Sequence, residues 1–593
     1  MANKKLLGLM FLTLFSFLSV SGVPAAAQVY DALPELSFPL WVLSWDDISV
    51  DTGTGLKLQM SQIGIDFDVT IMDDDPMYEG INPDGGFIVY EMSHGYSPFP
   101  DHPYDRMHSD NIVYYGGNPY VLNNATVDAL IEDYLSASPA ELAEAARLVQ
   151  VAAKYNIPYI PLYLSDDTHA IRSEWTNYTI KPGGIFTTFN PQTVVFMTSS
   201  VDNSLFVMAY SSDIGEMNPL FWRSERSHWY NMLVYDTLLS FDNESNLIPW
   251  LAEDYAISAD GTQINFTLRT GAQWHDGLPV RPEDVEFSIN YYKNGPSDVN
   301  DWPTFQHITS TSIDGQVITI NMDQTMAFAP HIFGTQMYVL PEHVRDDAPQ
   351  NDARWDDPTN GTAHTGSGPY EFDSRDPDEF TLVTKFANWW GPTNPYVGQL
   401  PNIDAFRIDV VIGQDARILA MRAGDADSER YEVFGAYVNV VLNAPELTLV
   451  TGLASQWDYV LGFHLNVTEP GFPGLGISDF RVRKAMSHAI DRAQLVNIGR
   501  LGHGRETHSI IPETFYASLY HPDGDFWEHN TTIANNILDA AGYLDVDGDG
   551  VREYPGVVLP PPPPNLILIG IAGAVALIIG IVISYFIFRM RKG

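Results

Sequence analysis

The sequence predicts an α/β protein of two or three globular units that is exported and carries one transmembrane helix near its C-terminal end. Three observations indicate this. The chain has 593 residues with 45% hydrophobic content, which is enough to bury a large core. In its middle, a strand pattern is followed by a helix pattern, and apolar stretches stand near both ends.

The middle of the chain predicts a β-hairpin followed by a helix. Two Asp-Gly pairs flank alternating apolar and polar residues between Ile264 and Leu268, as a hairpin requires. Pro282 suits the first turn of a helix, the two acidic residues after it suit the positive end, and Val285 begins the buried side. We interpret Trp274 and His275, which lie between the two elements, as framework residues of a turn.

The net charge limits the possible binding partners, and the cysteine content limits how the chain can be cross-linked or anchored. The formal net charge is −44, which argues against nucleic acid and against docking on anionic lipid, because phosphate groups would be repelled. We interpret the acidic excess as a solvated surface. The chain has no cysteine, so neither disulfides nor a lipid-modified N-terminal cysteine can hold it.

The two ends predict export and anchoring. Residues 1–27 combine two lysines, an apolar run and three alanines, which is typical of a secretory signal cleaved after Ala27. Residues 566–588 are uncharged and mostly apolar, long enough to cross a hydrocarbon core of about 30 Å. The basic residues at 589–592 keep the tail in the cytoplasm, and the prolines at 560–564 favour a stiff spacer. We therefore expect a single-pass protein of the cell membrane with an extracellular body.

Five blocks after residue 249 carry a family resemblance. They are Trp250-Leu251-Ala252-Glu253, Ser258-Ala259-Asp260-Gly261, Leu268-Arg269-Thr270-Gly271, Trp274-His275-Asp276-Gly277 and Pro282 to Ser288. Their order and spacing closely resemble the signature of the extracytoplasmic solute-binding proteins, family 5, of peptide/nickel-type ABC importers. The family's later blocks follow in order: Leu340 to Val344, Gly366 to Tyr370, Asn388 to Gly391, Gly424 to Asp427, Phe480 to Met486 and Ala489 to Arg492.

The position of the signature predicts a circular permutation. In the family this stretch lies near the mature N-terminus, whereas here it begins at residue 250. Segments 56–69, 139–155 and 157–163 resemble the part of the family's C-terminal lobe that would otherwise follow residue 550. A remnant of a tandem duplication is the alternative. The resemblance implies a two-lobe, periplasmic-binding-protein-like fold (type II, cluster C) with an extra subdomain, closing over ligand by hinge motion.

The chain is expected to divide as follows. The parts are a signal peptide, 1–27; the first part of a membrane-proximal lobe, 28–170; the first part of the other lobe, 171–245; the extra subdomain, 246–350; the second part of that lobe, 351–409; the second part of the membrane-proximal lobe, 410–556; a proline-rich linker, 557–565; the transmembrane helix, 566–588; and a cytoplasmic tail, 589–593.

The resemblance implies a receptor rather than an enzyme. It predicts a membrane-anchored protein, arranged like archaeal surface-anchored binding proteins, that captures an oligopeptide or similar solute. A separate permease and ATPase would complete the importer, because the chain carries no phosphate-binding Gly-Lys-Ser/Thr loop. An oligosaccharide receptor, an extracellular hydrolase and a structural surface protein are the alternatives. Zinc-protease and serine-hydrolase motifs and cysteine nucleophiles are absent from the sequence.

The resemblance also names candidate ligand contacts. Peptide-binding members have a Trp-Ser-Ala-Asp-Tyr-type segment whose aspartate pairs with the ligand's α-amino group. The matching residues here are Met92, Ser93, His94, Gly95 and Tyr96, so glycine stands where that aspartate belongs. Asp101 is a substitute if the loop is realigned. Tryptophans in segments that line or border the family's cleft are Trp222, Trp229, Trp389 and Trp390. We expect most of them to belong to the core, with exposure in the cleft as the alternative.

Two further kinds of site follow from residue patterns. Asp545, Asp547 and Asp549 have the acidic spacing of a calcium loop, although Gly556 lacks the carboxylate of its twelfth position. A helix-to-strand connector is the alternative, and no other cofactor is expected. Candidate glycosylation sites, compatible with an exported protein, are Asn124, Asn177, Asn243, Asn265, Asn360, Asn466 and Asn530.

Overall fold

The structure is a computed structural model that describes residues 35–555. Within that range it omits 45–46, 82–84, 97–98, 114–116, 180–195, 222–224, 243–245, 297–298, 301, 347, 431, 434 and 468–474. The described chain forms two compact units, residues 37–537 and residues 35–36 with 538–555. The expected signal peptide, proline-rich linker, transmembrane helix and tail lie outside the described residues. Across the described range, no helix is both long and apolar enough to cross a bilayer.

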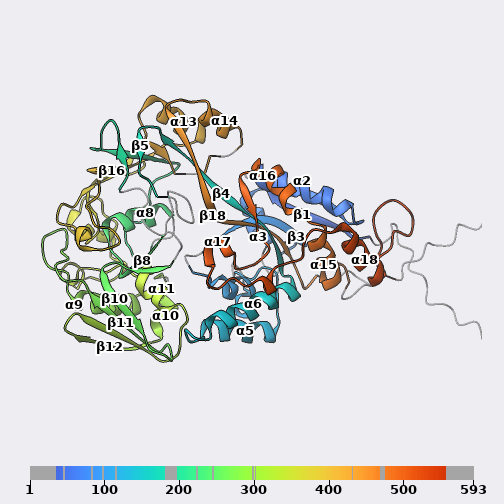
Figure 1. Ribbon diagram of the computed structural model, residues 1–593, viewed down its shortest axis with the longest axis horizontal. Coiled ribbons are helices and arrows are strands. Elements are labelled where there is room, and N and C mark those ends of the chain that lie inside the picture. Colours follow the sequence, from blue (N-terminus) through green and yellow to red (C-terminus); the bar gives the residue numbers. More distant parts are fainter. Residues whose placement is uncertain are drawn as a thin grey trace, which may run out of the picture. The chain divides into compact units, whose positions relative to one another are not determined.

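One large mixed sheet runs through the first unit (Figure 1). Its strands, in spatial order, are β14 (Tyr370–Asp376), β15 (Phe380–Lys385), β16 (Ala405–Val410), β7 (Phe206–Tyr210), β17 (Ser428–Glu429), β4 (Tyr159–Arg172), β18 (Leu447–Phe463), β3 (Val89–Gly95), β1 (Ser37–Leu43) and β2 (Asp66–Met72), with β19 (Gly504–Glu506) paired to β4. β4 and β18 pair along most of their length and connect the two ends of this sheet.

Residues from the front and the rear of the chain build one end of this sheet. β1 pairs in parallel with β2 and β3, and β3 pairs antiparallel with β18. The helix α2 (Asp47–Ser61) packs on α16 (Arg492–Arg500), where the Gln59 side chain donates to the Asp491 carbonyl at 3.0 Å. Arg483 of α15 (Phe480–Ala489) donates to the Ile157 carbonyl at 3.0 Å. We call this part, residues 37–164 and 457–537, the front–rear lobe.

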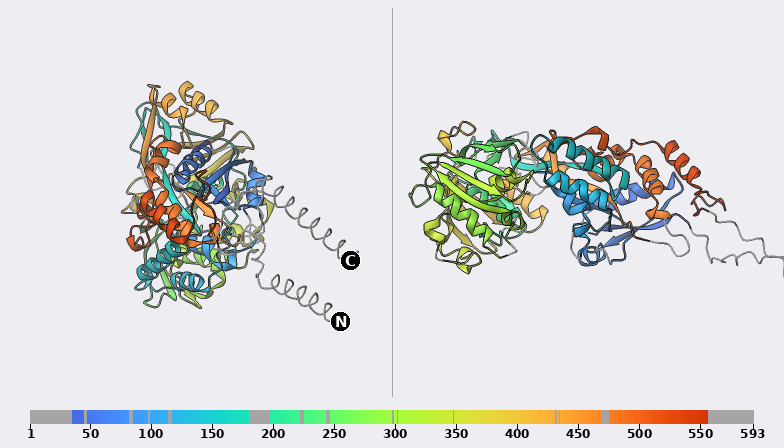
Figure 2. Two further views of the ribbon diagram at one scale, coloured as in Figure 1. Left: turned by 90° about the vertical axis from the view of Figure 1, so that its right-hand side faces the viewer. Right: turned by 90° about the horizontal axis from the view of Figure 1, so that it is seen from below.

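Further helices complete the front–rear lobe. α5 (Ala125–Leu135) and α6 (Leu142–Asn156) pack against each other (Figure 2). α5 begins at Asn124, whose side chain accepts from the Thr126 backbone N–H and so caps the helix. The remaining helices of this lobe and of the second unit are α3 (Asp74–Gly80), α4 (His102–Met107), α17 (Glu513–Tyr516) and α18 (Thr531–Ala541).

The middle of the chain, residues 198–444, forms the middle lobe. It contains the other end of the large sheet and a separate four-stranded sheet of β10 (Ala252–Ile257), β11 (Gln263–Leu268), β13 (Val317–Met322) and β12 (Ile308–Asp314). Its smaller pair is β8 (Leu239–Phe241) with β9 (Leu247–Pro249), and its β6 (Thr198–Ser199) pairs with β5 (Trp175–Thr176), which precedes this range. Its helices are α8 (Glu225–Val234), α9 (Pro282–Lys293), α10 (Trp302–Gln306), α11 (Ala329–His331), α12 (Glu342–Arg345), α13 (Gln414–Ala423) and α14 (Ala436–Leu442).

The hairpin and helix predicted in the middle of the chain are confirmed. β10 and β11 pair antiparallel around a turn in which Gly261 has φ of +70°, a conformation that glycine adopts without strain. Residues along β11 alternate between buried and half-buried. α9 begins at Pro282, and the Asp284 side chain accepts from the Arg281 backbone N–H at 2.8 Å, which satisfies the helix start.

Trp274 and His275 hold two loops together, as the framework interpretation predicts. Trp274 is fully buried. The His275 ring accepts at Nδ1 from the Gly366 N–H at 3.1 Å, and its Nε2 lies 3.1 Å from the Gly368 carbonyl. Burial lowers the pKa of His275 to about 4, so the ring is neutral and donates from Nε2. The turn at Trp274 and His275 and the block that begins at Gly366 are therefore held against each other by these hydrogen bonds.

Candidate functional site

A cavity of about 560 Å³ opens between the two lobes. On the front–rear side its wall includes Asp101, Tyr104 and Asp105 around α4, and Glu132, Leu135 and Ser136 at the end of α5. On the other side the middle lobe contributes Pro303, Thr304, His307, residues 324–326, Phe328, Ala329 and Ile332. We call this space the interlobe cavity. Because its walls come from different lobes, its volume depends on how far the lobes are apart.

The two walls of the interlobe cavity differ in chemistry. Asp101, Asp105 and Glu132 place three carboxylates on the front–rear side. Among the described residues, the middle lobe contributes no carboxylate to the lining; it adds apolar side chains such as Phe328 and Ile332, beside polar ones such as His307. Such a cavity suits a ligand with a cationic group and apolar side chains, since carboxylates bind ammonium groups through charge-assisted hydrogen bonds.

Direct contacts close one edge of this cavity. The Ala327 backbone N–H donates to the Leu135 carbonyl at 2.8 Å. The Phe99 and Phe328 rings stack with centroids 5.6 Å apart, and Phe328 also meets the Tyr134 ring edge to face at 5.4 Å. Aromatic pairs of this kind add to the stabilisation from area burial alone. The structure therefore holds the lobes together at a small contact beside an open space.

Among the predicted ligand contacts, Asp101 lies in the wall of the interlobe cavity, whereas Ser93, His94, Gly95 and Tyr96 are not part of its lining. Gly95 ends β3 and pairs with Trp457 of β18. A Cβ on Gly95 would lie 3.3 Å from the Trp457 ring, so that ring crowds the place where the family's aspartate side chain would begin. Trp457 is 44% exposed and presents an aromatic surface there.

A buried ion pair lies directly behind Gly95. Arg106 Nη1 contacts Asp458 Oδ2 at 3.2 Å, with side-chain exposures of 8% and 0%. The Tyr96 hydroxyl donates to the same Asp458 oxygen at 2.8 Å, and Arg106 Nη2 donates to the Gly95 carbonyl at 3.0 Å. A carboxylate thus stands next to the expected position, but the guanidinium neutralises it. Asp458 is therefore not available to receive a ligand's ammonium group.

The histidines near this pair are neutral. Burial lowers the pKa of His94 well below its ordinary value, and the positive charge of Arg106 lowers it further. Burial and Arg106 act in the same way on His102, whose Nε2 lies 2.6 Å from the Ile510 carbonyl. The Tyr96 ring packs on His102 and on Tyr516. These side chains form a buried polar and aromatic support for α4, the helix that carries Tyr104 and Asp105.

Among the candidate tryptophans, those at 229, 389 and 390 lie in the core and not in the lining of the interlobe cavity. Trp229 is fully buried, and Trp389 and Trp390 are 3% and 4% exposed. Trp390 and Trp250 donate their indole N–H groups to the two oxygens of Asp236 at 2.8 and 3.0 Å. These rings pack around an internal carboxylate because a buried acid requires donors. Trp222 lies outside the described residues.

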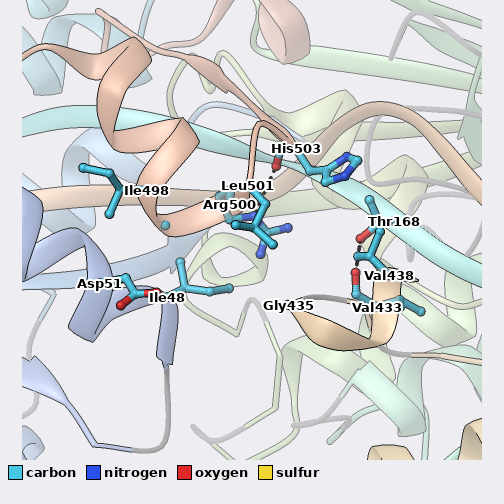
Figure 3. A pocket seen from close by; sticks show the side chains of 11 residues that line it. Ile48, Asp51, Thr168, Val433, Gly435, Val438, Ile498, Arg500, Leu501 and His503 are labelled. Atoms are coloured by element: carbon cyan, nitrogen blue, oxygen red, sulfur yellow. Dashed lines mark hydrogen bonds between the residues drawn. The ribbon is translucent and has the colours of Figure 1, made fainter. Parts of the chain in front are cut away.

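A second, smaller cavity of about 110 Å³ lies beside the strands that join the lobes (Figure 3). It is lined by Ile48, Asp51, Thr168, Val433, Gly435, Val438, Ile498 to Leu501 and His503. Arg500 pairs with Glu432 at 2.5 Å and donates to the His503 carbonyl at 3.2 Å. This volume holds a few water molecules rather than a peptide, so we interpret it as part of the joint between the lobes.

The remaining predicted sites are placed as follows. Asp545, Asp547 and Asp549 lie in the loop after α18, where Asp545 and Asp547 gather with Glu553. Among the sequons, Asn177, Asn466 and Asn530 are exposed, whereas Asn124, Asn265 and Asn360 are partly covered. Asn243 lies outside the described residues. Glycosylation stays a prediction.

A family match decides the classification of the chain. Residues 246–573 match the bacterial extracellular solute-binding proteins, family 5. The chain belongs to this family. The family resemblance predicted from the signature blocks is thereby confirmed, and with it the two-lobe α/β fold in its general form. The match covers the middle lobe from residue 246 onward and the rear of the chain up to residue 573.

Individual relatives are distant. The glutathione-binding protein GsiB of Pectobacterium atrosepticum is 23% identical over 341 residues, which are 57% of this chain and 61% of GsiB. The chain thus spans about six tenths of the length of the curated relatives it matches. Among solved structures, NikZ of Campylobacter jejuni with Ni(L-His) has a TM-score of 0.45 at 19% identity, covering 60% of this chain and 67% of NikZ. The oligopeptide-binding protein AppA of Bacillus subtilis with a nonapeptide has a TM-score of 0.44 at 20% identity, with the same coverages.

The sequence reasoning missed Arg106, Asp458 and Trp457. One signal was present for Asp458, because it is an acidic residue within the strand-like apolar run 457–463, where a charge is uncommon unless it is paired. Its partner lies 352 residues away in the sequence, and local patterns carry no information about such a pair.

Proposed function

We propose that this protein is the substrate-binding component of an ABC importer, and that it captures oligopeptides or solutes of similar chemistry outside the cell. Membership of family 5 supports the role of solute binding. The permease and the ATPase would be separate chains. The interlobe cavity is the observation that carries the proposal, because a ligand held there contacts both lobes and stabilises their closed arrangement.

The lining of the cavity favours peptides. Its volume of about 560 Å³ falls within the range of small-ligand sites, which runs from about 300 to 1,000 Å³. Asp105 and Glu132 can receive an ammonium group, while Phe328 and Ile332 offer apolar contact. An oligosaccharide receptor is the second candidate. It is less favoured because Trp229 and Trp389, which could have stacked on sugar rings, are not part of the lining of the interlobe cavity.

Titration of the full-length protein with ligands tests this proposal. Thermal unfolding is followed with oligopeptides that carry a free amino terminus, with the same peptides N-acetylated, and with mannohexaose. We expect a saturable rise of the unfolding temperature with the free peptides and a weaker one after acetylation. Stabilisation by mannohexaose alone would support the oligosaccharide receptor. Turnover of any of these compounds would support a hydrolase, and no response to any of them a structural role.

A pair of variants localises the site. Asp105→Asn removes one carboxylate of the interlobe cavity, and we expect the peptide affinity to fall about tenfold or more, since a charge-assisted hydrogen bond contributes about 1.5 to 3 kcal/mol. Asp110→Asn is the matched control, because Asp110 is exposed, close in sequence and not part of the lining. Isothermal titration calorimetry measures both. Equal affinities of the two variants would place the ligand elsewhere.

We also propose the circular permutation, or a duplication remnant with the same outcome, and anchoring through residues 566–588. Hydrogen bonding of β3 and β4 to β18 within one sheet supports the permutation, because it brings the front of the chain into the lobe formed by its rear. Export and anchoring rest on the sequence of residues that the structure does not describe.

Cleavage of the chain tests whether the front and rear segments form one folded lobe. A protease site inserted between Gly184 and Ile185 separates the front strands from the rest of the chain and leaves every described contact intact. We expect the two cleaved pieces to co-elute in gel filtration without denaturant and to unfold in one transition, since β3 and β4 remain paired with β18. Pieces that separate after cleavage would mean that the front of the chain is an independent module. The uncleaved insertion variant is the control.

A further inference from the structure

We propose that the loop of residues 545–553 binds one calcium ion through Asp545, Asp547, Asp549 and Glu553. The ligand atoms of Asp545, Asp547 and Glu553 all lie within 4.8 Å of one another. The same holds for Asp547 and Asp549 together with Glu35, which reaches the loop from the start of the described chain. We call these five residues the acidic cluster. All of them belong to the second compact unit.

Glu553 is the residue that distinguishes this loop from an ordinary acidic turn. It is fully buried, although glutamate is seldom buried without a partner. Its Oε2 accepts from the Val546 backbone N–H at 2.7 Å, and its Oε1 has no hydrogen-bond partner among the described residues. Burying a carboxylate oxygen without a hydrogen-bond partner costs folding free energy, and a bound cation beside that oxygen offsets this cost. The side chain is directed at the cluster, since its oxygen lies near those of Asp545 and Asp547.

The backbone of the loop turns the acids toward one another. Asp545 Oδ1 accepts from the Gly548 N–H at 2.7 Å, and its Oδ2 accepts from the Gly550 N–H at 3.2 Å. Gly548 and Gly550 have φ of +85° and +99°, which side-chain-bearing residues rarely adopt. Gly550 is the sixth residue from Asp545, where calcium loops use glycine for their sharp turn.

Glu553 also supplies a carboxylate that the twelfth position of the loop lacks. The twelfth position, Gly556, cannot supply a carboxylate, and this weakens the comparison with a helix–loop–helix calcium site. The structure instead brings in a carboxylate from the ninth position, where such loops use a side chain or a water molecule. Asp545, Asp547 and Asp549 occupy the first, third and fifth positions, and Val551 stands at the seventh, where a backbone carbonyl serves.

The donor set favours calcium over other metals. All of the clustered side chains are carboxylates, which suits a hard cation and not zinc. Arg552, the basic residue within the loop, donates to Asp539 at 2.6 Å and to the Tyr543 carbonyl, so its charge is directed away from the cluster. Magnesium demands small, near-octahedral coordination and keeps its water, whereas a flexible turn of several carboxylates accommodates the larger ion.

Calcium would stabilise the contact between residues 35–36 and the acidic loop in the second unit. The Leu36 N–H donates to the Arg552 carbonyl at 2.7 Å, and Glu553 forms isolated bridges with Glu35 and with Leu544. Because a Glu35 carboxylate oxygen lies within 4.8 Å of those of Asp547 and Asp549, an ion held by these two aspartates also attracts Glu35 and adds a link between the same two segments. Calcium modules outside cells bind with dissociation constants of about 0.1 to 1 mM, and we expect an affinity in this range.

Binding of calcium to the full-length protein is measured after removal of metal with EDTA. Calorimetric titration with calcium chloride should show one saturable site. Terbium should bind in the same place and emit on excitation of tyrosine, because Tyr554 directly follows the ligand Glu553 in the chain. Calcium should displace terbium, and magnesium at the same concentration should not. Absence of saturable calcium binding up to about 10 mM, tenfold above the expected range, would overturn the proposal.

Substitutions assign the site. The double variant Asp547→Asn with Asp549→Asn changes exposed side chains, so we expect it to fold and to bind calcium at least about tenfold more weakly, because two charged ligands are lost. Glu553→Gln should have a comparable effect if it folds. The matched control is Asp260→Asn, an exposed aspartate that closes a turn by accepting from Thr262 but lies in the middle lobe. Wild-type affinity in the double variant would overturn the assignment. The readout does not involve the solute, so it is independent of the proposed function.

Discussion

Replacing Arg106 by methionine is expected to lower the free energy of unfolding by about 3 to 5 kcal/mol, because it leaves the Asp458 carboxylate buried without its counter-charge. Asp458 is fully buried, and Arg106 is the cation that contacts it, at 3.2 Å. Methionine keeps much of the apolar length of the arginine, so most of the effect comes from the lost charge and from the lost hydrogen bond to the Gly95 carbonyl. Urea unfolding followed by tryptophan fluorescence measures the change.

Two further variants separate the buried charge from general disruption. Combining Arg106→Met with Asp458→Asn removes both charges, keeps an acceptor for Tyr96, and should recover much of the lost stability. Arg422→Met breaks an exposed pair with Glu446 and should leave the unfolding midpoint close to that of wild type. An Arg106→Met variant within about 1 kcal/mol of wild type would show that the buried pair contributes no more than a surface pair.

The second large effect is a pH dependence that originates at Asp236. Burial raises the pKa of Asp236 to about 7, and the indole N–H groups of Trp390 and Trp250 oppose this rise only in part. Between the unfolded pKa and about 7 the native state holds a proton that the unfolded state has lost, so this group's contribution to stability falls as the pH rises. The fall is about 1.4 kcal/mol per pH unit and ends above about pH 7.

The variant Asp236→Asn isolates this contribution. Buried histidines such as His331 and His364, whose pKa values burial lowers to about 4, act in the opposite direction below about pH 6.5. The quantity to measure is therefore the stability difference between Asp236→Asn and wild type. We expect it to move in favour of the variant by about 2 to 3 kcal/mol from pH 5 to pH 7 and then to level off. The exposed Asp254→Asn should show a difference that does not change with pH, and the same behaviour at position 236 would contradict the prediction.

Asp236 also explains why the paired tryptophans at 389 and 390 belong to the core. The sequence is compatible with either place, core or cleft wall. In the structure Trp390 and Trp250 bind Asp236, and Trp389 packs against both rings. The choice between wall and core depends on which side chain lies opposite, and Asp236 is 154 residues away from Trp390 in the sequence. Aromatic residues serve both purposes, so residue type does not distinguish them.

The glycines at 366 and 368 also show that a sequence motif can be recognised without its structural reason being apparent. The block beginning at Gly366 is recognisable in the sequence, but its reason is tertiary. A Cβ on Gly366 would lie 1.9 Å from the Val234 carbonyl oxygen, and one on Gly368 would lie 2.7 Å from the Leu233 carbonyl oxygen. Both positions need glycine because the end of α8 passes directly over them. The pattern identifies the block, and only the packing of α8 shows why it is required.

The local elements and the family followed from the sequence alone. The β10–β11 turn, the start of α9 and the acidic loop after α18 depend on neighbours a few residues apart, which the sequence displays directly. The tertiary structure decided which aromatic rings are exposed, that Arg106 neutralises Asp458, and that Glu553 completes the acidic cluster. Burial and pairing of these groups depend on segments that meet only when the chain folds, and the electrostatic cost of a buried charge exists only in that environment.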